Sequence, residues 1–329
     1  MLSLNKVVVT PPMLKQFSTA YLPLHQRGIS VVFNEGVYPL NDEQLAGFIG
    51  DAQAGIIGID QVTSLVFERC PGLRILSRNG VGYDNVDLDA ATRHHVSVTI
   101  PFGANSVSVA ELTISLIISL LRDVVNQHKD LQNGVFKRII GTEVSGKTLG
   151  IIGLGQVGRR VATRALGLEM KIIANDIEPD YTFGEKHGIP FLSFDEVLSQ
   201  SDIVSLHVPL TPLTRNMINA TTIKRMKKGS FLINTARAPV VDPYALAQAL
   251  DTQILLGAAV DVHFEELGGG ARAHEAFIGR KDIITTPHIG AYTAEALYRT
   301  TEFAVVNLID FIEGRKPYGL INKEGWVEK

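Results

Sequence analysis

The chain has 329 residues, which exceeds one hydrophobic core of ordinary size and predicts two domains. Hydrophobic residues make up 45% and charged residues 20%, a composition that excludes the disordered and fibrous classes. The 31 basic and 34 acidic residues give a net charge of -3 and form no basic run, so no nucleic-acid partner is expected.

Membrane and secretory signals are also missing from the sequence pattern. The first residues read as a strand rather than as a signal peptide. The most apolar helical stretch, residues 112–121, has about half the length that a membrane span requires. The single cysteine, Cys70, excludes an internal disulfide. We therefore expect a cytoplasmic protein with no membrane partner.

Short apolar, β-branched runs alternate with amphipathic segments along the chain, which predicts parallel sheets with crossover helices and an α/β fold. The expected strands fall into two series: 6–10, 30–33, 55–59, 74–77 and 97–99, then 148–152, 171–175, 203–207, 230–234, 257–260 and 283–285. A turn signal at 101–103 separates the series. A long helix at about 105–131 opens the second series, and a last helix, 292–314, follows its final strand.

A glycine-rich turn opens the second series of strands. The sequence Gly153-Leu154-Gly155-Gln156-Val157-Gly158 follows the 148–152 strand and begins a helix at 156–166. This is the context of a dinucleotide-binding turn, in which glycines admit the pyrophosphate and the helix N-terminus attracts it. In isolation the same pattern is as often an incidental turn.

An acidic residue ends the next strand at the distance that a dinucleotide site requires. Asp176 lies 18 positions after Gly158 (176 − 158), where a carboxylate accepts hydrogen bonds from ribose hydroxyls. No Lys or Arg follows at 177–179 to hold a 2′-phosphate, so NAD is predicted rather than NADP. The alternative is that Asp176 only caps the strand. His207, which ends the 203–207 strand beside Pro209, is expected to line the cofactor cleft.

Three groups suited to hydride-transfer chemistry follow three further strands. Arg237 follows the 230–234 strand and suits bidentate binding of a carboxylate. An acidic cluster, 261–266, follows the next strand, and His288 follows the last. Reduction of a ketone needs a proton donor near neutral pH, and a carboxylate beside a histidine favours its protonated form. Each group alone has an ordinary structural alternative, and no spacing predicts a metal site.

Several segments together resemble the D-isomer-specific 2-hydroxyacid dehydrogenase family, closest to phosphoglycerate dehydrogenases and hydroxypyruvate reductases. The segments are GVGYDNVDLDAA, NSVSVAELT, GKTLGIIGLGQVG, HVPLTPLTRNMI, MKKGSFLINTAR, AAVDVHFEE and TPHIGA. The resemblance implies a Rossmann NAD-binding domain, residues 104–291, inserted into a flavodoxin-like substrate domain, residues 1–103 and 292–329. It also implies an NAD-dependent enzyme that interconverts a D-2-hydroxy acid and a 2-keto acid, and a homodimer formed through the helix near 110–122.

The resemblance also assigns site residues. The catalytic residues are expected to be Arg237, Glu266 and His288, and Val81, Gly82 and Arg237 are expected to bind the substrate. Asp261 is expected to face the nicotinamide carboxamide. The full set of expected cofactor contacts is Gly153, Gly155, Gln156, Val157, Gly158, Asp176, His207, Pro209, Thr211, Thr235, Ala236, Asp261, His288 and Gly290.

The chain departs from the family pattern at three places. Ala238 replaces the glycine after the catalytic arginine, and Leu267 replaces the proline after the catalytic glutamate. Gly58 stands where phosphoglycerate dehydrogenases carry an arginine for substrate phosphate, a role that Arg78 is considered to fill in part. Phosphoglycerate and the hydroxypyruvate or glyoxylate type of substrate therefore both remain open. An alternative function is an NAD-sensing interaction protein similar to the corepressors of this family. Formate dehydrogenase is disfavoured, since it has glutamine where this chain has Glu266.

Overall fold

The structure is a computed structural model that describes residues 4–264 and 275–326. The chain forms two compact units. The discontinuous unit comprises Met1–Asn105 and Thr293–Lys329, and the continuous unit comprises Ser106–Tyr292. Each unit is described by itself.

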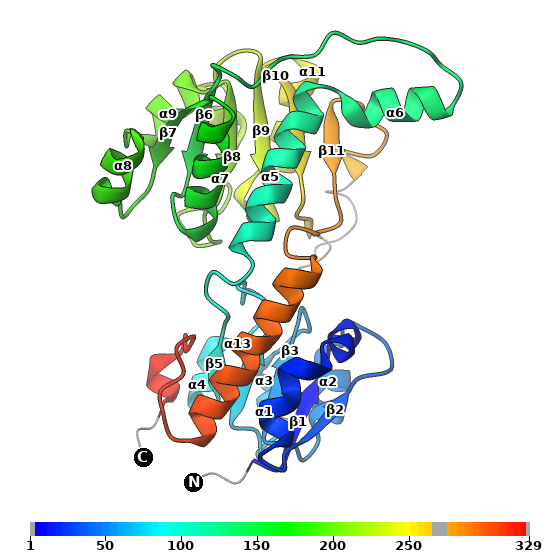
Figure 1. The fold of residues 1–329 in the computed structure, drawn as a ribbon, viewed down its shortest axis with the longest axis vertical. Helices are drawn as coiled ribbons and strands as arrows, with labels where there is room; N and C mark the ends of the chain where they lie inside the picture. Colours follow the sequence, from blue (N-terminus) through cyan, green and yellow to red (C-terminus); the bar gives the residue numbers. More distant parts are fainter. Residues whose placement is uncertain (1–3, 265–274, 327–329) are drawn as a thin grey trace. The chain divides into compact units, whose positions relative to one another are not determined.

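A five-stranded parallel sheet forms the centre of the discontinuous unit, in the order β2-β1-β3-β4-β5 (Figure 1). This order is that of flavodoxin-like folds. The strands are β1 (Lys6–Val9), β2 (Ser30–Phe33), β3 (Ala54–Ile57), β4 (Ile75–Arg78) and β5 (Ser97–Thr99). The helices are η1 (Pro12–Gln16), η2 (Ser18–Tyr21), α1 (Leu22–His25), α2 (Asp42–Ile49), α3 (Ser64–Arg69), α4 (Leu88–Arg93), α13 (Ala294–Ile312) and η5 (Lys323–Gly325).

Helices cover both faces of this sheet, and its central strands β3 and β4 are buried along their whole length. Val8 packs with residues of α2, α3 and α4 on one face. Val7 and Val9 pack with residues of α1 and α13 on the other. The last long helix of the chain, α13, therefore completes the core of the unit that the N-terminal residues begin.

The continuous unit contains a six-stranded parallel sheet in the order β11-β10-β9-β8-β6-β7. A parallel bridge between Ala174 and Phe191 continues the order beyond β7. The strands are β6 (Thr148–Ile152), β7 (Lys171–Asn175), β8 (Ile203–Leu206), β9 (Ser230–Asn234), β10 (Leu255–Val260) and β11 (Ile283–Thr285). The chain order reverses between β6 and β8, which is the switch point where doubly wound sheets bind dinucleotides.

Helices cover both faces of the second sheet. α5 and α7 share one hydrophobic cluster with it, and α9, α10 and α11 share the other. Its helices with described bounds are α5 (Ser106–Leu121), α6 (Val124–Gln132), α7 (Gln156–Gly167), α8 (Tyr181–His187), α9 (Phe194–Gln200), α10 (Ala220–Ile223), η3 (Ala238–Val240) and α11 (Pro243–Asp251).

The predicted α/β class and the eleven predicted strands are confirmed, with ends that agree within two residues. The prediction of one helix over residues 105–131 is wrong. The chain adopts a left-handed conformation at Asp123 (φ 50°) and starts a new helix, α6. α6 has no buried residue, and the chain returns from it to β6 in a long loop (Figure 1).

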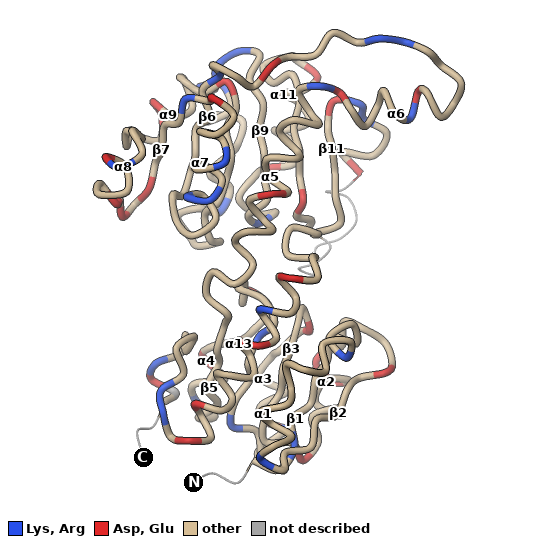
Figure 2. The backbone as a smooth tube through the Cα atoms, viewed as in Figure 1, with Lys and Arg blue, Asp and Glu red and all other residues tan. Residues whose placement is uncertain are grey.

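Charges of both signs are interspersed along each unit (Figure 2). Within 4–264 and 275–326, every helix is too short or too polar to cross a membrane. The same residues contain no cluster of His, Cys, Asp and Glu that could hold a metal ion.

Candidate dinucleotide and catalytic site

The turn after β6 accepts only glycine at two of its three glycine positions. Gly153 has a φ of +93°, and a Cβ there would lie 2.9 Å from the backbone of His207. A Cβ at Gly158 would lie 2.2 Å from the carbonyl oxygen of Gly153. A Cβ at Gly155 would meet nothing within 4 Å. The first and third glycines therefore allow the close packing of turn, helix and strand, and the second faces open space.

This turn presents a helix N-terminus. α7 begins at Gln156 with Gly155 as its N-cap, and no side chain of residues 4–264 and 275–326 caps it with a hydrogen bond. Gly155 and Gln156 are exposed, and Val157 is half-buried. The first amides of a helix carry a partial positive charge, so this end suits a pyrophosphate.

Asp176 lies directly after β7 and contacts the glycine turn. Its Oδ2 accepts a hydrogen bond from the Leu154 N–H at 2.7 Å, and its Oδ1 accepts one from the Glu178 N–H at 3.0 Å. A carboxylate has about four lone-pair sites. Asp176 can therefore hold the turn and still accept hydrogen bonds from ribose hydroxyls. It contacts the glycine turn, so its role goes beyond capping the end of β7.

His207 lies at the end of β8, on the other side of the switch point. Its Nε2 is 2.9 Å from the Ser205 hydroxyl, and its Nδ1 is buried without a hydrogen-bond partner among the described residues. Burial lowers the pKa of His207 to about 3. The imidazole is therefore neutral at physiological pH and cannot serve as the proton donor. Pro209 is exposed, and Thr211 is held in a turn by the Thr214 hydroxyl at 2.8 Å.

Arg237 lies in the loop after β9, and hydrogen bonds with the Asn234 side chain hold the backbone of this loop. The Asn234 side chain accepts from the Ala236 N–H at 3.0 Å and donates to the Arg237 carbonyl at 3.0 Å. Arg237 is half-buried, and its Nη1 donates to the Ala236 carbonyl at 2.7 Å. Thr235 is buried, and its hydroxyl is 3.0 Å from that of Thr113 on α5. Thr235 is one of the expected cofactor contacts, and its side chain points toward the core.

Ala238 is compatible with the site despite the family's glycine at this position. It begins η3 and does not have a positive φ, so its side chain introduces no backbone strain.

Asp261, at the end of β10, holds the loop that carries His288. The carboxylate is buried and accepts three hydrogen bonds, from the Thr286 hydroxyl at 2.6 Å, the Ile289 N–H at 2.9 Å and the Gly290 N–H at 2.8 Å. These donors lie on both sides of His288, whose φ is 52°. A left-handed conformation is uncommon for a residue with a side chain, and it persists only where its surroundings fix it.

The register of the sheet gathers these groups at one edge. Val260 pairs with Asn234 on one side and with Thr285 on the other. Arg237 is three residues past Asn234, Asp261 one past Val260 and His288 three past Thr285. The carboxyl ends of parallel strands lie at the same edge, so the arginine and the histidine flank the aspartate. Glu266 lies outside the described residues, as do Glu265 and Leu267.

Val81 and Gly82 lie on the discontinuous unit, in the loop after β4. Both are half-buried, and within the described part of the chain no acceptor takes a hydrogen bond from either N–H. Two adjacent amides of this kind suit a small anion.

Gly58 cannot be exchanged for a larger residue without a change in its neighbours. A Cβ there would lie 2.0 Å from the Tyr38 hydroxyl oxygen. The idea that Arg78 fills the phosphate-binding role is wrong, because its side chain is buried within the unit. Its Nη1 donates to Asn85 Oδ1 at 2.7 Å and its Nη2 to the Gly58 carbonyl at 2.5 Å.

Sequence reasoning missed the polar residues that hold the two loops, Asn234 and Thr286. Neither has a distinctive spacing, although Asn234 is the last residue of β9 and Thr286 directly follows β11, and a predicted site residue lies shortly after each strand. It also missed His263, whose Nε2 is 2.8 Å from the Thr286 carbonyl.

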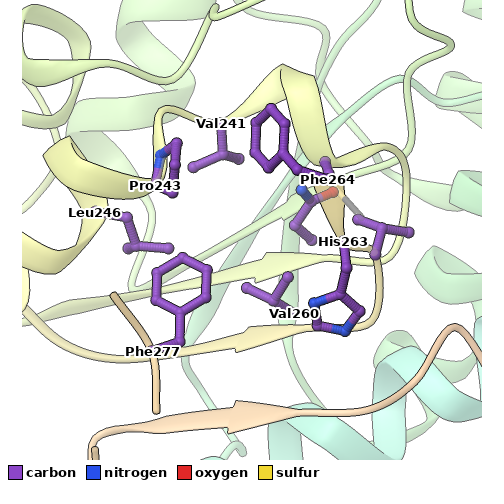
Figure 3. A pocket seen from close by; sticks show the side chains of 10 residues that line it. Val241, Pro243, Leu246, Val260, His263, Phe264 and Phe277 are labelled. Carbon is purple, nitrogen blue, oxygen red and sulfur yellow. The ribbon is translucent and has the colours of Figure 1, made fainter. Parts of the chain in front are cut away.

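A small cavity lies behind the Arg237 loop (Figure 3). Its volume is about 20 Å³, and it is lined mainly by apolar side chains, including Val241, Leu246, Val260 and Phe277. A volume of this size admits one water molecule at most, so the cavity is not a substrate site.

The continuous unit is thus a dinucleotide-binding domain of the Rossmann class, with an Arg and a His at the edge of its sheet. The family model for the NAD binding domain of D-isomer specific 2-hydroxyacid dehydrogenases matches residues 114–290. The chain belongs to the D-isomer specific 2-hydroxyacid dehydrogenase family, a family of oxidoreductases, as its sequence motifs predict. The cofactor is NAD.

The relatives include proteins with different substrates in their names. Over 302 residues the chain is 35% identical to a glyoxylate reductase of Thermofilum pendens. This aligned region covers 89% of this chain and 88% of that protein. Over 306 residues it is 36% identical to a D-3-phosphoglycerate dehydrogenase of Pongo abelii, covering 92% of this chain but only 56% of that protein.

A solved structure of D-lactate dehydrogenase from Aquifex aeolicus, complexed with NAD and lactic acid, has a TM-score of 0.81 and 29% identity. The similarity covers 94% of this chain and 96% of that one.

The residues present fit NAD. Gly155 leaves open space beside the uncapped N-terminus of α7, and Asp176 keeps acceptor capacity for the ribose.

Proposed function

We propose that this protein is a cytoplasmic NAD-dependent dehydrogenase that interconverts a D-2-hydroxy acid and its 2-keto acid. The observation that carries the proposal is the arrangement at the edge of the second sheet. Arg237 and His288 flank Asp261 there, in the unit that holds the glycine turn. Membership of the family supports the same reaction.

In the proposed mechanism, the bound nicotinamide supplies or accepts the hydride. The Arg237 guanidinium binds the carboxylate and polarises the carbonyl of the substrate, since it offers paired donors to two oxygens. His288 donates a proton to the carbonyl oxygen during reduction and accepts it during oxidation. We assign Glu266 to hold the charge on His288. His207 is not the proton donor, because burial keeps it neutral.

The discontinuous unit is proposed to bind the substrate carboxylate. Val81 and Gly82 supply the two adjacent N–H groups for this role. Two N–H donors neutralise part of an anionic charge without adding a side chain.

The substrate is proposed to be an unphosphorylated acid of the hydroxypyruvate or glyoxylate type. The argument rests on Gly58 and Arg78. Tyr38 occupies the space that a side chain at position 58 would need, and Arg78 is buried with its guanidinium bonded inside the unit. Neither position therefore offers a cation to a phosphate group.

A homodimer is proposed through the continuous unit. α5, the helix expected at the interface, contributes much of its surface to the core. Apolar exposure is instead concentrated on α6 and the loop after it, where Phe136 is 78% and Ile140 99% exposed. Exposed apolar groups gathered in this way mark an association surface. Phe136→Asp is expected to shift the protein toward monomer in sedimentation velocity, whereas Leu213→Asp, at an exposed apolar residue elsewhere in the unit, is expected to have no effect.

The reaction is tested by following NADH oxidation with glyoxylate, hydroxypyruvate, 3-phosphohydroxypyruvate and pyruvate. His288→Ala is expected to lower kcat by about two to four orders of magnitude, the usual scale for loss of a general acid, with NADH binding retained. His25→Ala, at an exposed histidine of the other unit, is the matched control. NADH binding without oxidation by any of these acids would contradict the proposed reaction, as would full turnover in His288→Ala.

A further inference from the structure

A positively charged side chain lies next to the carboxylate that is expected to bind the ribose. Arg159, in the first turns of α7, donates through Nε to the carbonyl oxygen of Leu154 at 3.0 Å. Asp176 accepts from the N–H of the same residue at 2.7 Å. The Leu154 backbone therefore binds both groups, the carboxylate through its N–H and the guanidinium through its carbonyl oxygen. Figure 2 shows basic residues on α7 and acidic residues between β7 and α8.

The remaining part of the Arg159 guanidinium is held by α8. Its Nη1 forms an ion pair with Asp180 Oδ2 at 2.9 Å, and its Cζ lies 5.0 Å from the centre of the Phe183 ring. Asp180 is also the N-cap of α8, because it accepts the Phe183 N–H at 3.0 Å. That hydrogen bond, together with the charge of Arg159, lowers the pKa of Asp180, so its carboxylate is ionised at neutral pH.

We propose that Arg159 is a latent ligand for the 2′-phosphate of an adenosine nucleotide, and that Asp180 keeps it from this role. The inference rests on the proposed NAD-dependent function and adds a second determinant of its cofactor preference. Asp176 repels a 2′-phosphate directly, while Asp180 neutralises the cation that would otherwise attract it. Arginine is the side chain that suits such a phosphate, since its planar donors match two phosphate oxygens.

The charge of Asp180 can be removed without loss of its structural role. In Asp180→Asn the side-chain oxygen still accepts the Phe183 N–H, and asparagine is as good an N-cap as aspartate. The substitution therefore releases Arg159 from its ion pair and leaves α8 in place. Both members of the pair are partly exposed, so the expected effect is moderate and decreases with salt.

The test measures binding of adenosine 2′,5′-bisphosphate and of 5′-AMP by calorimetry at low ionic strength, which needs no turnover. The starting variant is Asp176→Ser, which removes the direct repulsion. Adding Asp180→Asn is expected to tighten binding of the bisphosphate by a further about 3- to 10-fold, within the range of exposed ion pairs and charge-assisted hydrogen bonds, with 5′-AMP unchanged. Adding Arg159→Gln to the double variant is expected to abolish this gain.

The third substitution separates release of Arg159 from a simple change in net charge. A through-space effect of the lost Asp180 charge would persist without Arg159. Asp195→Asn, which breaks another exposed ion pair of the same unit (Arg225 at 2.6 Å), is the matched control and should have no effect in the Asp176→Ser background.

Two outcomes overturn the inference: no gain from Asp180→Asn, or a gain that survives Arg159→Gln. Failure of the proposed function is recognised separately, because the wild-type protein would then bind 5′-AMP or NADH without oxidising NADH in the presence of any 2-keto acid.

Discussion

Asp261→Asn is expected to loosen the His288 loop while leaving the sheet intact. The substitution keeps the shape of the side chain but replaces one carboxylate oxygen with an amino group. The amide oxygen can still accept from the Thr286 hydroxyl and the Ile289 N–H. The amino group, however, faces the Gly290 N–H, which donates to Asp261 Oδ2 at 2.8 Å in the native protein.

The magnitude follows from one hydrogen bond lost, two weakened and one buried donor left without a partner. Hydrogen bonds to charged groups contribute about 1.5–3 kcal/mol, and an unsatisfied buried donor costs about 1–3 kcal/mol, so the closed loop should lose roughly 2–4 kcal/mol. A loss of this size increases local opening by about 30- to 1,000-fold.

Hydrogen exchange of the Ile289 and Gly290 amides measures this opening directly, and kcat with NADH reports its effect on the proposed proton donor. We expect both to change together. The matched control is Asp242→Asn, because Asp242 also accepts two backbone N–H groups, at 2.9 and 3.1 Å, but as a helix N-cap, where an amide serves equally well. Exchange at Ile289 and Gly290 as slow in Asp261→Asn as in Asp242→Asn would refute the reasoning.

Three further changes test other parts of the molecule. Gly158→Ala should lower the free energy of unfolding by more than about 2 kcal/mol and weaken NADH binding, because its Cβ would lie 2.2 Å from the Gly153 carbonyl oxygen; unchanged urea denaturation would contradict this. His207 has a folded-state pKa of about 3, below its ordinary 6.5, so its contribution to stability is complete above pH 6.5 and is lost as the pH falls toward 3. The free energy of unfolding, obtained from denaturation curves, should fall by up to about 2 kcal/mol between pH 7.5 and 5. The His207→Gln variant should not show this fall. Gly58→Ala should destabilise the protein by about 1–3 kcal/mol through its contact with the Tyr38 hydroxyl, and Tyr38→Phe should recover part of that loss in thermal melts; equal losses in both backgrounds would show that the contact is not responsible.

Much of the fold could be predicted because its strands are buried on both faces. Such strands are short apolar runs bounded by turn residues, and the predicted strand at 230–234 matches β9 at both ends. The edge that carries Arg237 and His288 follows from the same pattern, since side chains directly after parallel strands share one edge.

The break between α5 and α6 could not be predicted, because no glycine or proline marks it. The end of α5 is held by a distant residue, with the Leu121 carbonyl accepting the Thr142 N–H at 2.9 Å. The turn itself is held by a hydrogen bond from Asn126 to the Asp123 side chain at 2.6 Å. The contact with Thr142 depends on the path of the long loop and has no signal in the local sequence.

The environment of Arg78 was hidden for a related reason. One partner, Gly58, follows β3 and meets Arg78 only when β3 and β4 pair, and the other, Asn85, lies in the loop after β4. A sequence pattern identifies an arginine at a strand end but does not tell whether its guanidinium faces the ligand or the interior.

The hydrogen bonds that Asp261 accepts from its loop make two neighbouring positions, 289 and 290, differ in how well they tolerate substitution. Ile289 holds the loop through its backbone alone: its N–H donates to Asp261, its carbonyl accepts from the Tyr292 N–H, and its side chain is 38% exposed. Gly290 also gives its N–H, but a Cβ there would press on Asp261 Oδ2 at 3.0 Å. A mutant library at position 289 can therefore vary size and polarity beside His288 while the loop keeps its path, whereas any side chain at position 290 requires the Asp261 carboxylate to move.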